Sequence, residues 1–265
     1  MAGDWENKAI VYTQAGSQKP FCVIAVDTLP DLHLVGAAAG SEYLPFYRYD
    51  EGGNRVENIT DWSLKQFQQH YQLGRGKKTQ PITKEDIFHY VYAVLHNPIY
   101  REKYATNLKR SFQRIPFYGE VDSVFRQWAA LDAELMAIHI GYEAANTFLF
   151  TRVDVPETRA IAAGQPPKGI LKSNPESRRI VFDSETVLTN IPHAAWDNRL
   201  GNRSAIDWVL DQHKETKPKD PTIRERFDTY RLADYKEEVI DRLARVTTVS
   251  METISITKKM QYLPR

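Results

Sequence analysis

The spacing of apolar residues changes several times along the chain, and these changes predict where strands give way to helices. Apolar residues are continuous or alternate over 7–13, 21–26 and 43–50, which is typical of short strands. A further short strand is expected at 32–35, followed by a segment of small residues. The first fifty residues are therefore predicted to be rich in β-structure.

Helical spacing begins near residue 58 and continues through the middle of the chain. Helices are predicted over 58–71 and 117–145, separated by a basic loop at 72–81 and a pair of helices within 81–117. In that pair, Thr83 and Asp86 fit a capping box. Asn97 is expected to cap the second helix, with Pro98 at its first position, where a missing N–H costs nothing.

The second helix of this pair is apolar on one side and basic on the other. Five basic residues and one acid lie between residues 98 and 117. The basic residues include Arg101, Lys109, Arg110 and Arg114. Such a face could contact phosphate groups, and it could equally be the solvated outer face of a core helix.

The C-terminal part alternates turns with short regular elements. A proline-rich linker is expected over 151–168, a β-hairpin over 169–183 and irregular chain over 185–196. A helix is predicted at 203–213 and a flexible polar loop at 214–221. A long helix should cover 234–260, although its β-branched end could instead form a strand. The prediction is an α+β fold with a β-rich and helical portion, 1–150, and a hairpin and helical portion, 151–265, packed as one recognition unit.

Composition narrows the class of protein. The 265 residues are 42% hydrophobic and 26% charged, with a net charge of +1, so any surface for nucleic acid must be a local patch. The single Cys22 excludes an internal disulfide and a cysteine metal cage. No apolar run is long enough to span a membrane and no signal pattern opens the chain, so a cytoplasmic protein is expected.

No set of catalytic residues emerges from the sequence. Tyr71 and Lys78 stand where a phosphate-binding loop needs glycine and serine or threonine. The acids of 183–185 lack the lysine of metal-dependent nucleases and are interpreted as a strand-end turn. His139 continues an apolar stripe and is interpreted as a core residue with a satisfied hydrogen bond. No metal, cofactor or catalytic residue is predicted.

Two long blocks of the chain are distinctive, DIFHYVYAVLHNPIYREKYATNLKRSFQRIPF and RLGNRSAIDWVLDQH. They resemble the strongest signatures of the C-terminal specificity domain of Type ISP restriction–modification enzymes. These enzymes join a nuclease, a helicase-like motor, an adenine methyltransferase and a target-recognition domain. ENKAIVYTQAGSQKPFCVIAVDTLPDLHLVG, ENITDWSLKQF and VTTVSMETISI resemble the opening, second and closing blocks of the specificity domain, in the same order. The resemblance implies a non-catalytic domain that recognises duplex DNA beside methyltransferase and helicase–nuclease domains.

Two groups of residues are the candidates for DNA contact. One comprises Arg101, Lys109, Arg110 and Arg114, with Lys19 as a weaker candidate from the first loop. The other comprises Arg199, Asn202 and Arg203, where Asn202 is expected to cap a helix whose free N–H groups favour phosphate. Alternatively, Asn202 only caps, and both arginines pair with Asp197 and Asp207. A rival function is a protein-interaction module that docks a methyltransferase or motor domain without touching DNA.

Overall fold

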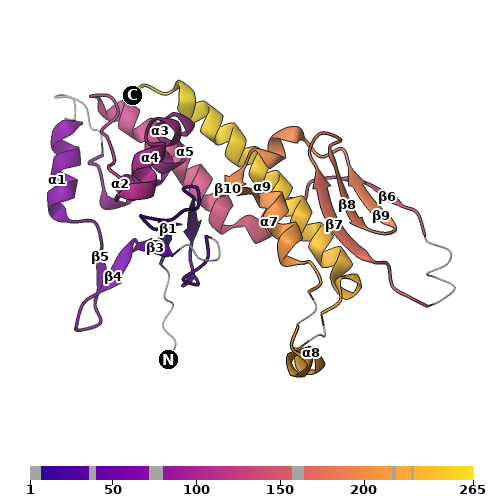
Figure 1. The fold of residues 1–265 in the computed structure, drawn as a ribbon. Helices are drawn as coiled ribbons and strands as arrows, with labels where there is room; N and C mark the ends of the chain where they lie inside the picture. Colours follow the sequence, from indigo (N-terminus) through magenta and orange to yellow (C-terminus); the bar gives the residue numbers. More distant parts are fainter. Residues whose placement is uncertain (1–6, 36–39, 72–79, 157–163, 217–218, 228–229) are drawn as a thin grey trace. The chain divides into compact units, whose positions relative to one another are not determined.

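The computed structural model describes residues 7–35, 40–71, 80–156, 164–216, 219–227 and 230–265 (Figure 1). The chain forms two compact units. Unit 1 contains residues 1–141 and 255–265, and unit 2 contains residues 142–254. The last turns of the C-terminal helix therefore belong to unit 1.

A three-stranded antiparallel sheet opens unit 1. Its strands are β1 (Ala9–Thr13), β2 (Val23–Val26) and β3 (Ser41–Pro45), in the order β2-β1-β3. Every residue of the central strand β1 is buried, in keeping with its unbroken apolar run. The hairpin of β4 (Tyr47–Tyr49) and β5 (Arg55–Glu57) follows.

The strand expected at 32–35 is wrong, because these residues form a turn. The Asp31 side chain accepts a hydrogen bond from the backbone N–H of His33 at 2.7 Å, and the Asp31 carbonyl accepts from Leu34 N–H at 3.1 Å. An aspartate that bonds to the backbone two residues ahead favours a turn over a strand. The adjoining small-residue segment lies largely outside the described residues, as does the basic loop up to residue 79.

The helices of unit 1 begin where the local capping signals place them. Thr60 caps α1 (Asp61–His70), and Thr83 and Asp86 form the capping box of α2 (Lys84–His96). Helix α2 lies against α5 (Asp122–Ile140). Both helices contribute large buried side chains to the core of the unit, including Tyr90, Tyr92, Phe125, Trp128 and Leu135.

The second helix of the predicted pair is interrupted. Asn97 caps α3 (Pro98–Lys103) through its side chain, with Pro98 in the first turn, as predicted. Tyr104 then leaves the helical region, and α4 (Ala105–Arg110) continues after it. Tyr100 and Leu108, one from each short helix, are buried as expected, while Tyr104 is half-buried.

The chain from 111 to 119 has no regular structure, yet buried tyrosine hydroxyl groups fix its backbone. Tyr100 donates to the Arg114 carbonyl at 2.9 Å and Tyr90 donates to the Pro116 carbonyl at 2.7 Å. The N–H of Tyr118 donates to the Tyr90 hydroxyl at 2.8 Å, and its carbonyl accepts from Tyr71 at 3.1 Å. These bonds replace the backbone pairing that a helix or sheet would supply.

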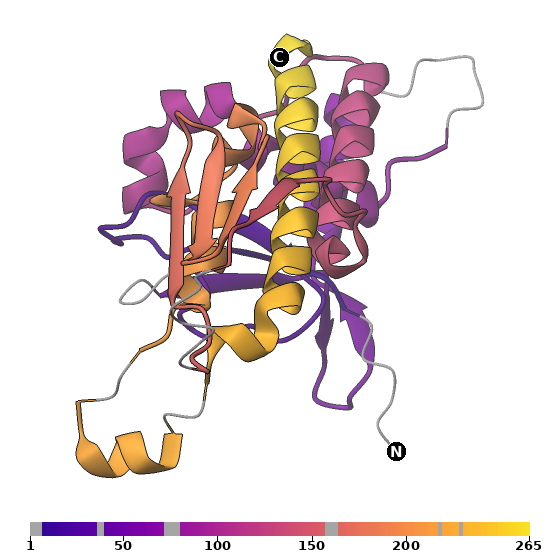
Figure 2. The same ribbon diagram turned by 90° about the vertical axis from the view of Figure 1, so that its right-hand side faces the viewer.

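The main sheet of unit 2 is four-stranded and antiparallel, in the order β6-β9-β8-β7 (Figure 2). The predicted hairpin is confirmed as β7 (Gly169–Asn174) and β8 (Arg179–Asp183). The linker and the irregular chain predicted beside it are wrong in part, because they contain β6 (Thr151–Asp154) and β9 (Thr186–Thr189). Residues 157–163 of the expected linker lie outside the described residues.

The turn at 183–185 is confirmed as a strand-end turn. One carboxylate oxygen of Asp183 accepts the N–H groups of Glu185 and Thr186 at 2.9 and 2.6 Å. The other oxygen of Asp183 pairs with Lys236 Nζ at 2.7 Å. Both oxygens therefore have structural partners, and no metal-ligating cluster of His, Cys, Asp or Glu occurs in the described part of the chain.

Short elements and helices complete unit 2. These are η1 (Tyr142–Ala144), η2 (His193–Trp196), β10 (Arg199–Leu200), β11 (Arg203–Ser204), α7 (Ala205–Gln212), α8 (Pro221–Phe227), η3 (Leu232–Tyr235) and α9 (Lys236–Tyr262). Helix α8 starts at the end of the predicted flexible loop, whose residues 217–218 lie outside the described residues. The β-branched end of α9 is helical. The hydroxyl of buried Thr247 donates a hydrogen bond to the Leu243 carbonyl, one turn earlier, at 2.7 Å.

The observed elements confirm the predicted α+β class, with a β-rich start, a helical middle and a long C-terminal helix. Across the described residues, no helix is both long and apolar enough to cross a membrane.

His139 is half-buried at the edge of the core and has the hydrogen-bond partner that was expected. Its Nδ1 shares a 2.6 Å hydrogen bond with the Tyr92 hydroxyl, and burial lowers its pKa to about 4. Burial also lowers the pKa of the neighbouring His96 well below its ordinary value. Both imidazoles are therefore neutral in the folded protein at pH 7.

These two histidines predict a loss of stability in acid. Below pH 6.5 the unfolded chain binds protons on both imidazoles that the folded chain excludes, so unfolding becomes easier as the pH falls towards 4. Each histidine contributes a slope of up to about 1.4 kcal/mol per pH unit to the free energy of unfolding. Urea unfolding at pH 7, 5.5 and 4.5 should therefore show a shallower decline for His139→Gln than for the native sequence. An equal decline in the free energy of unfolding of the two proteins would contradict the conclusion that His139 is neutral in the folded protein.

Candidate nucleic-acid interface

Three of the predicted basic residues lie exposed at the end of α4 and just beyond it. Lys109, Arg110 and Arg114 all project into solvent. In the described part of the chain, no carboxylate lies within ion-pair distance of any of them. A surface of uncompensated cations attracts phosphate groups, since no internal partner competes for the charge.

The first loop of the chain is fastened beside this group. The N–H of Gly16 donates to the Lys109 carbonyl at 2.7 Å, where φ at Gly16 is +86°. Gly16 can adopt this left-handed conformation because it lacks a Cβ atom. The N–H of exposed Lys19 donates to Ser17 Oγ at 3.0 Å, which shapes the rest of the loop. Two segments far apart in sequence are thus joined, and the α4 cation group is defined as Lys19, Lys109, Arg110 and Arg114.

Arg101 has a different environment from these four residues. It is half-buried, its Nε donates to the Leu95 carbonyl at 2.6 Å, and its guanidinium carbon lies 5.8 Å from the centre of the Phe21 ring. Burial lowers the pKa of Arg101. The sequence placed Arg101 on the basic face, but these contacts give it a packing role, and we leave it out of the α4 cation group.

The second candidate group forms a small hairpin in unit 2. Arg199 lies in β10, Asn202 in the turn and Arg203 in β11, and all three are exposed. The expected cap at Asn202 is wrong, because Ser204 caps α7 by accepting the N–H of Asp207 at 3.1 Å. Arg203 and Ser204 form the strand β11 before α7 begins, so the helix starts two residues later than the sequence predicted and its cap is Ser204.

The two arginines of this hairpin differ in the partners that hold their side chains. Arg199 donates to the Asn202 carbonyl across the turn. Arg203 forms a 2.5 Å ion pair with Asp211 and lies 5.5 Å from the centre of the Trp208 ring. The predicted pairing with Asp197 and Asp207 is therefore replaced by a pairing with Asp211. An arginine held in this way is oriented before any ligand arrives.

A polar hollow of about 520 Å³ adjoins Arg203 and adds two cations that the sequence did not single out. Lys172 comes from β7, and Lys214 follows α7 and pairs with Asp211 at 2.5 Å. Neither lysine belongs to a recognisable motif. They meet Arg203 only because β7 contacts α7 in the folded unit.

Each unit therefore carries an exposed group of cations, which is the kind of surface that attracts phosphate groups. The family model described as the Type ISP C-terminal specificity domain matches residues 1–242. The chain belongs to this family, whose members are recognition modules of Type ISP restriction–modification enzymes.

Solved structures of several enzymes resemble the chain, among them the following three. The cryo-EM structure of the DrdV–DNA complex matches with a TM-score of 0.87 and 48% identity, over 99% of this chain and 25% of that one. LlaGI, a nuclease-deletion mutant in complex with a DNA substrate mimic, matches with a TM-score of 0.68 and 22% identity, over 99% of this chain and 21% of that one. LlaBIII bound to DNA matches with a TM-score of 0.69 and 23% identity, over 98% of this chain and 16% of that one. No curated protein sequence matches the chain.

The chain thus spans about a quarter of the length of DrdV. The likeness to LlaGI and LlaBIII is one of fold, whereas the likeness to DrdV extends to nearly half of the residues.

The different environments of Arg101 and Lys109 predict that substitution affects stability at Arg101 and hardly at all at Lys109. Arg101→Ala removes a half-buried charged donor from the Leu95 carbonyl and should lower the free energy of unfolding by about 2 kcal/mol. Lys109→Ala should change it by less than about 0.5 kcal/mol, because the side chain is exposed. Urea unfolding of both variants measures the difference. Equal stabilities would mean that Arg101 has no packing role.

Proposed function

We propose that this chain recognises a target sequence in duplex DNA for a Type ISP restriction–modification enzyme and catalyses no reaction itself. The family assignment supports target recognition, and the 48% identical relative, DrdV, has been solved in a complex with DNA. The mismatches to a phosphate-binding loop at Tyr71 and Lys78, and to a nuclease site at 183–185, agree with a non-catalytic part. Adenine methylation, translocation and cleavage would belong to other domains.

The observation that carries the residue-level proposal is the α4 cation group. Its four cations come from two segments joined by the bond between Gly16 and the Lys109 carbonyl. Phosphate contacts fix the orientation of a protein on DNA without reading sequence. We assign Lys19, Lys109, Arg110 and Arg114 to that positioning task.

The hairpin of unit 2 is better suited to reading bases. Asn202 is exposed at its tip, and an asparagine amide can pair with both the N6 and N7 groups of adenine in the major groove. Arg203 is already oriented by Asp211 and Trp208, and a pre-oriented guanidinium can pair with guanine O6 and N7. Arg199 braces the turn through the Asn202 carbonyl.

The net charge of +1 implies that the chain binds DNA weakly by itself. Only a local group of cations neutralises phosphates, so the affinity should fall steeply with salt. We propose that the methyltransferase and helicase–nuclease domains of the parent enzyme supply further contacts, and that the protein acts in the cytoplasm, where the DNA is.

A protein-docking role remains the second candidate, because two leucines stand out in the loop after β2. Leu29 is 88% exposed and Leu32 is 64% exposed. Large exposed apolar side chains often mark contacts with another protein surface. Docking of another domain and recognition of DNA use different residues of unit 1, and one chain can do both.

Removal of two phosphate-contacting cations should weaken binding to every duplex alike. Lys109→Ala with Arg110→Ala should reduce the affinity for a mixed-sequence duplex by about tenfold at 50 mM salt and lower the slope of log K against log salt by about 2. Fluorescence anisotropy between 50 and 200 mM salt measures both quantities.

The matched control is Lys258→Ala with Lys259→Ala, an adjacent pair of exposed lysines on α9. This control should leave the slope unchanged. If both double variants reduce the slope equally, binding depends on total charge and the assigned site is wrong. If the native chain binds no duplex even at 50 mM salt, the docking role is favoured.

A further inference from the structure

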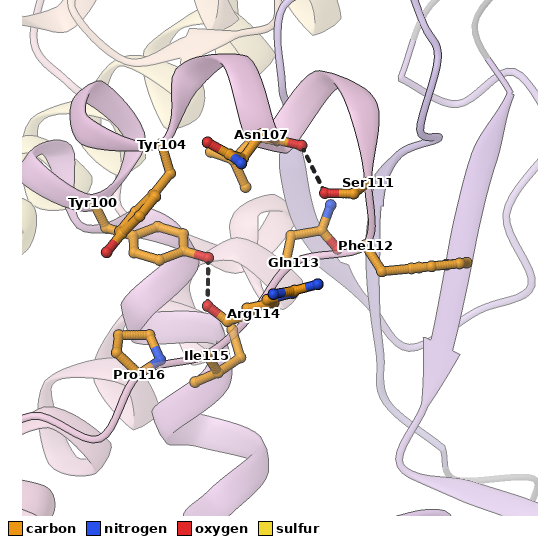
Figure 3. A pocket seen from close by; sticks show the side chains of 10 residues that line it. Tyr100, Tyr104, Asn107, Ser111, Phe112, Gln113, Arg114, Ile115 and Pro116 are labelled. Atoms are coloured by element: carbon orange, nitrogen blue, oxygen red, sulfur yellow. Dashed lines mark hydrogen bonds between the residues drawn. The ribbon is translucent and has the colours of Figure 1, made fainter.

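A hollow beside the α4 cation group has the properties of a binding site for a single nucleotide. It encloses about 400 Å³ and lies between α3, α4 and the extended chain that follows them (Figure 3). Pockets that bind small ligands begin at roughly 300 Å³. The hollow lies wholly within unit 1.

The walls of the hollow are aromatic and apolar. The rings of Tyr100 and Tyr104 have their centres 5.0 Å apart and are tilted by 52°. Tyr100 is fixed by its bond to the Arg114 carbonyl, and buried Leu108 lies beside it. Figure 3 shows both tyrosines on the same side of the hollow. The face of a tyrosine ring stacks on any nucleobase, contributing about 1–3 kcal/mol per base.

The polar groups of the hollow have no partners within the described part of the protein. The side-chain nitrogen of Gln113 is buried and makes no hydrogen bond. The exposed Asn107 amide, the Tyr104 hydroxyl and the Arg114 guanidinium likewise form no hydrogen bond or ion pair with described residues. A buried donor without a partner costs about 1–3 kcal/mol, and a ligand that supplies an acceptor removes this cost.

The chemistry of these groups specifies the ligand. Two carboxamides suit the donor and acceptor edge of a base, the tyrosines suit its planar face, and Arg114 suits a phosphate. Arg110 and Lys109, at the end of α4, add positive charge beside the opening. A recess accepts an unstacked base, whereas base edges inside a duplex are read by side chains that protrude into a groove.

We infer that this hollow binds one nucleoside 5′-phosphate, with the base against Tyr104, its edge on Gln113 and Asn107, and the phosphate on Arg114. The nucleotide could be extruded from bound DNA or free in solution. Binding of an extruded nucleotide rests on the proposed DNA recognition, whereas binding of a free nucleotide does not depend on it.

Calorimetric titration of the 265-residue chain with AMP, GMP, CMP and TMP tests the free form. At least one nucleotide should bind saturably, and Gln113→Ala and Arg114→Ala should each weaken its binding by about tenfold. Gln113 makes no internal hydrogen bond, so Gln113→Ala is expected to retain the native fold. Arg48→Ala, which removes an exposed arginine from β4, is the matched control and should bind like the native chain.

A second titration compares a fully paired duplex with the same duplex carrying one extrahelical nucleotide. If DNA supplies the nucleotide, the chain should prefer the extrahelical form by about tenfold, and Gln113→Ala should abolish the preference. The inference is overturned if no free nucleotide binds and the two duplexes bind equally, or if Gln113→Ala and Arg114→Ala leave binding unchanged. Binding of the paired duplex in the same titration reports on the proposed function independently, so the two failures are distinguishable.

Discussion

The structure of unit 1 depends on one constraint, which is that the polar groups of the buried helix α2 must find partners inside the protein. Tyr90 and Tyr92 are fully buried, and burial raises the pKa of both hydroxyls. Tyr90 meets this requirement by donating to the carbonyl of Pro116 and accepting the N–H of Tyr118. The chain after α4 is therefore held in one extended path by the core beneath it.

That path determines what the surface above it presents. A segment without helix or sheet would ordinarily be free to move, but the tyrosine hydroxyls secure its backbone at three points, namely Arg114, Pro116 and Tyr118. The Arg114 side chain is left exposed beside the end of α4, and the hollow opens between the segment and the two short helices. Positioning residues that are held by the core lose little entropy on binding, which favours recognition.

Much of the fold was predictable because its signals are local, as with the capping box at Thr83 and the Asn97-Pro98 helix start. The strands β6 and β9 were missed because each is only four residues long and has few apolar residues, with two charged residues in β6 and two threonines in β9. Pairing across the sheet therefore decides their structure. The presence of a cluster of positive charge between residues 98 and 117 was predictable from the sequence. Its division into exposed Lys109 and packed Arg101 was not, since that depends on the distant Phe21.

Sequence-specific recognition is the central claim, and selection from a pool of random duplexes tests it most directly. The chain should be incubated with the pool at low salt, and the retained DNA should be amplified and sequenced over successive rounds. The account predicts enrichment of one short motif, with mismatches at a defined position tolerated once Asn202 or Arg203 is replaced by alanine. Retention of DNA without any enriched motif would contradict it, because the contacts would then be to phosphate alone.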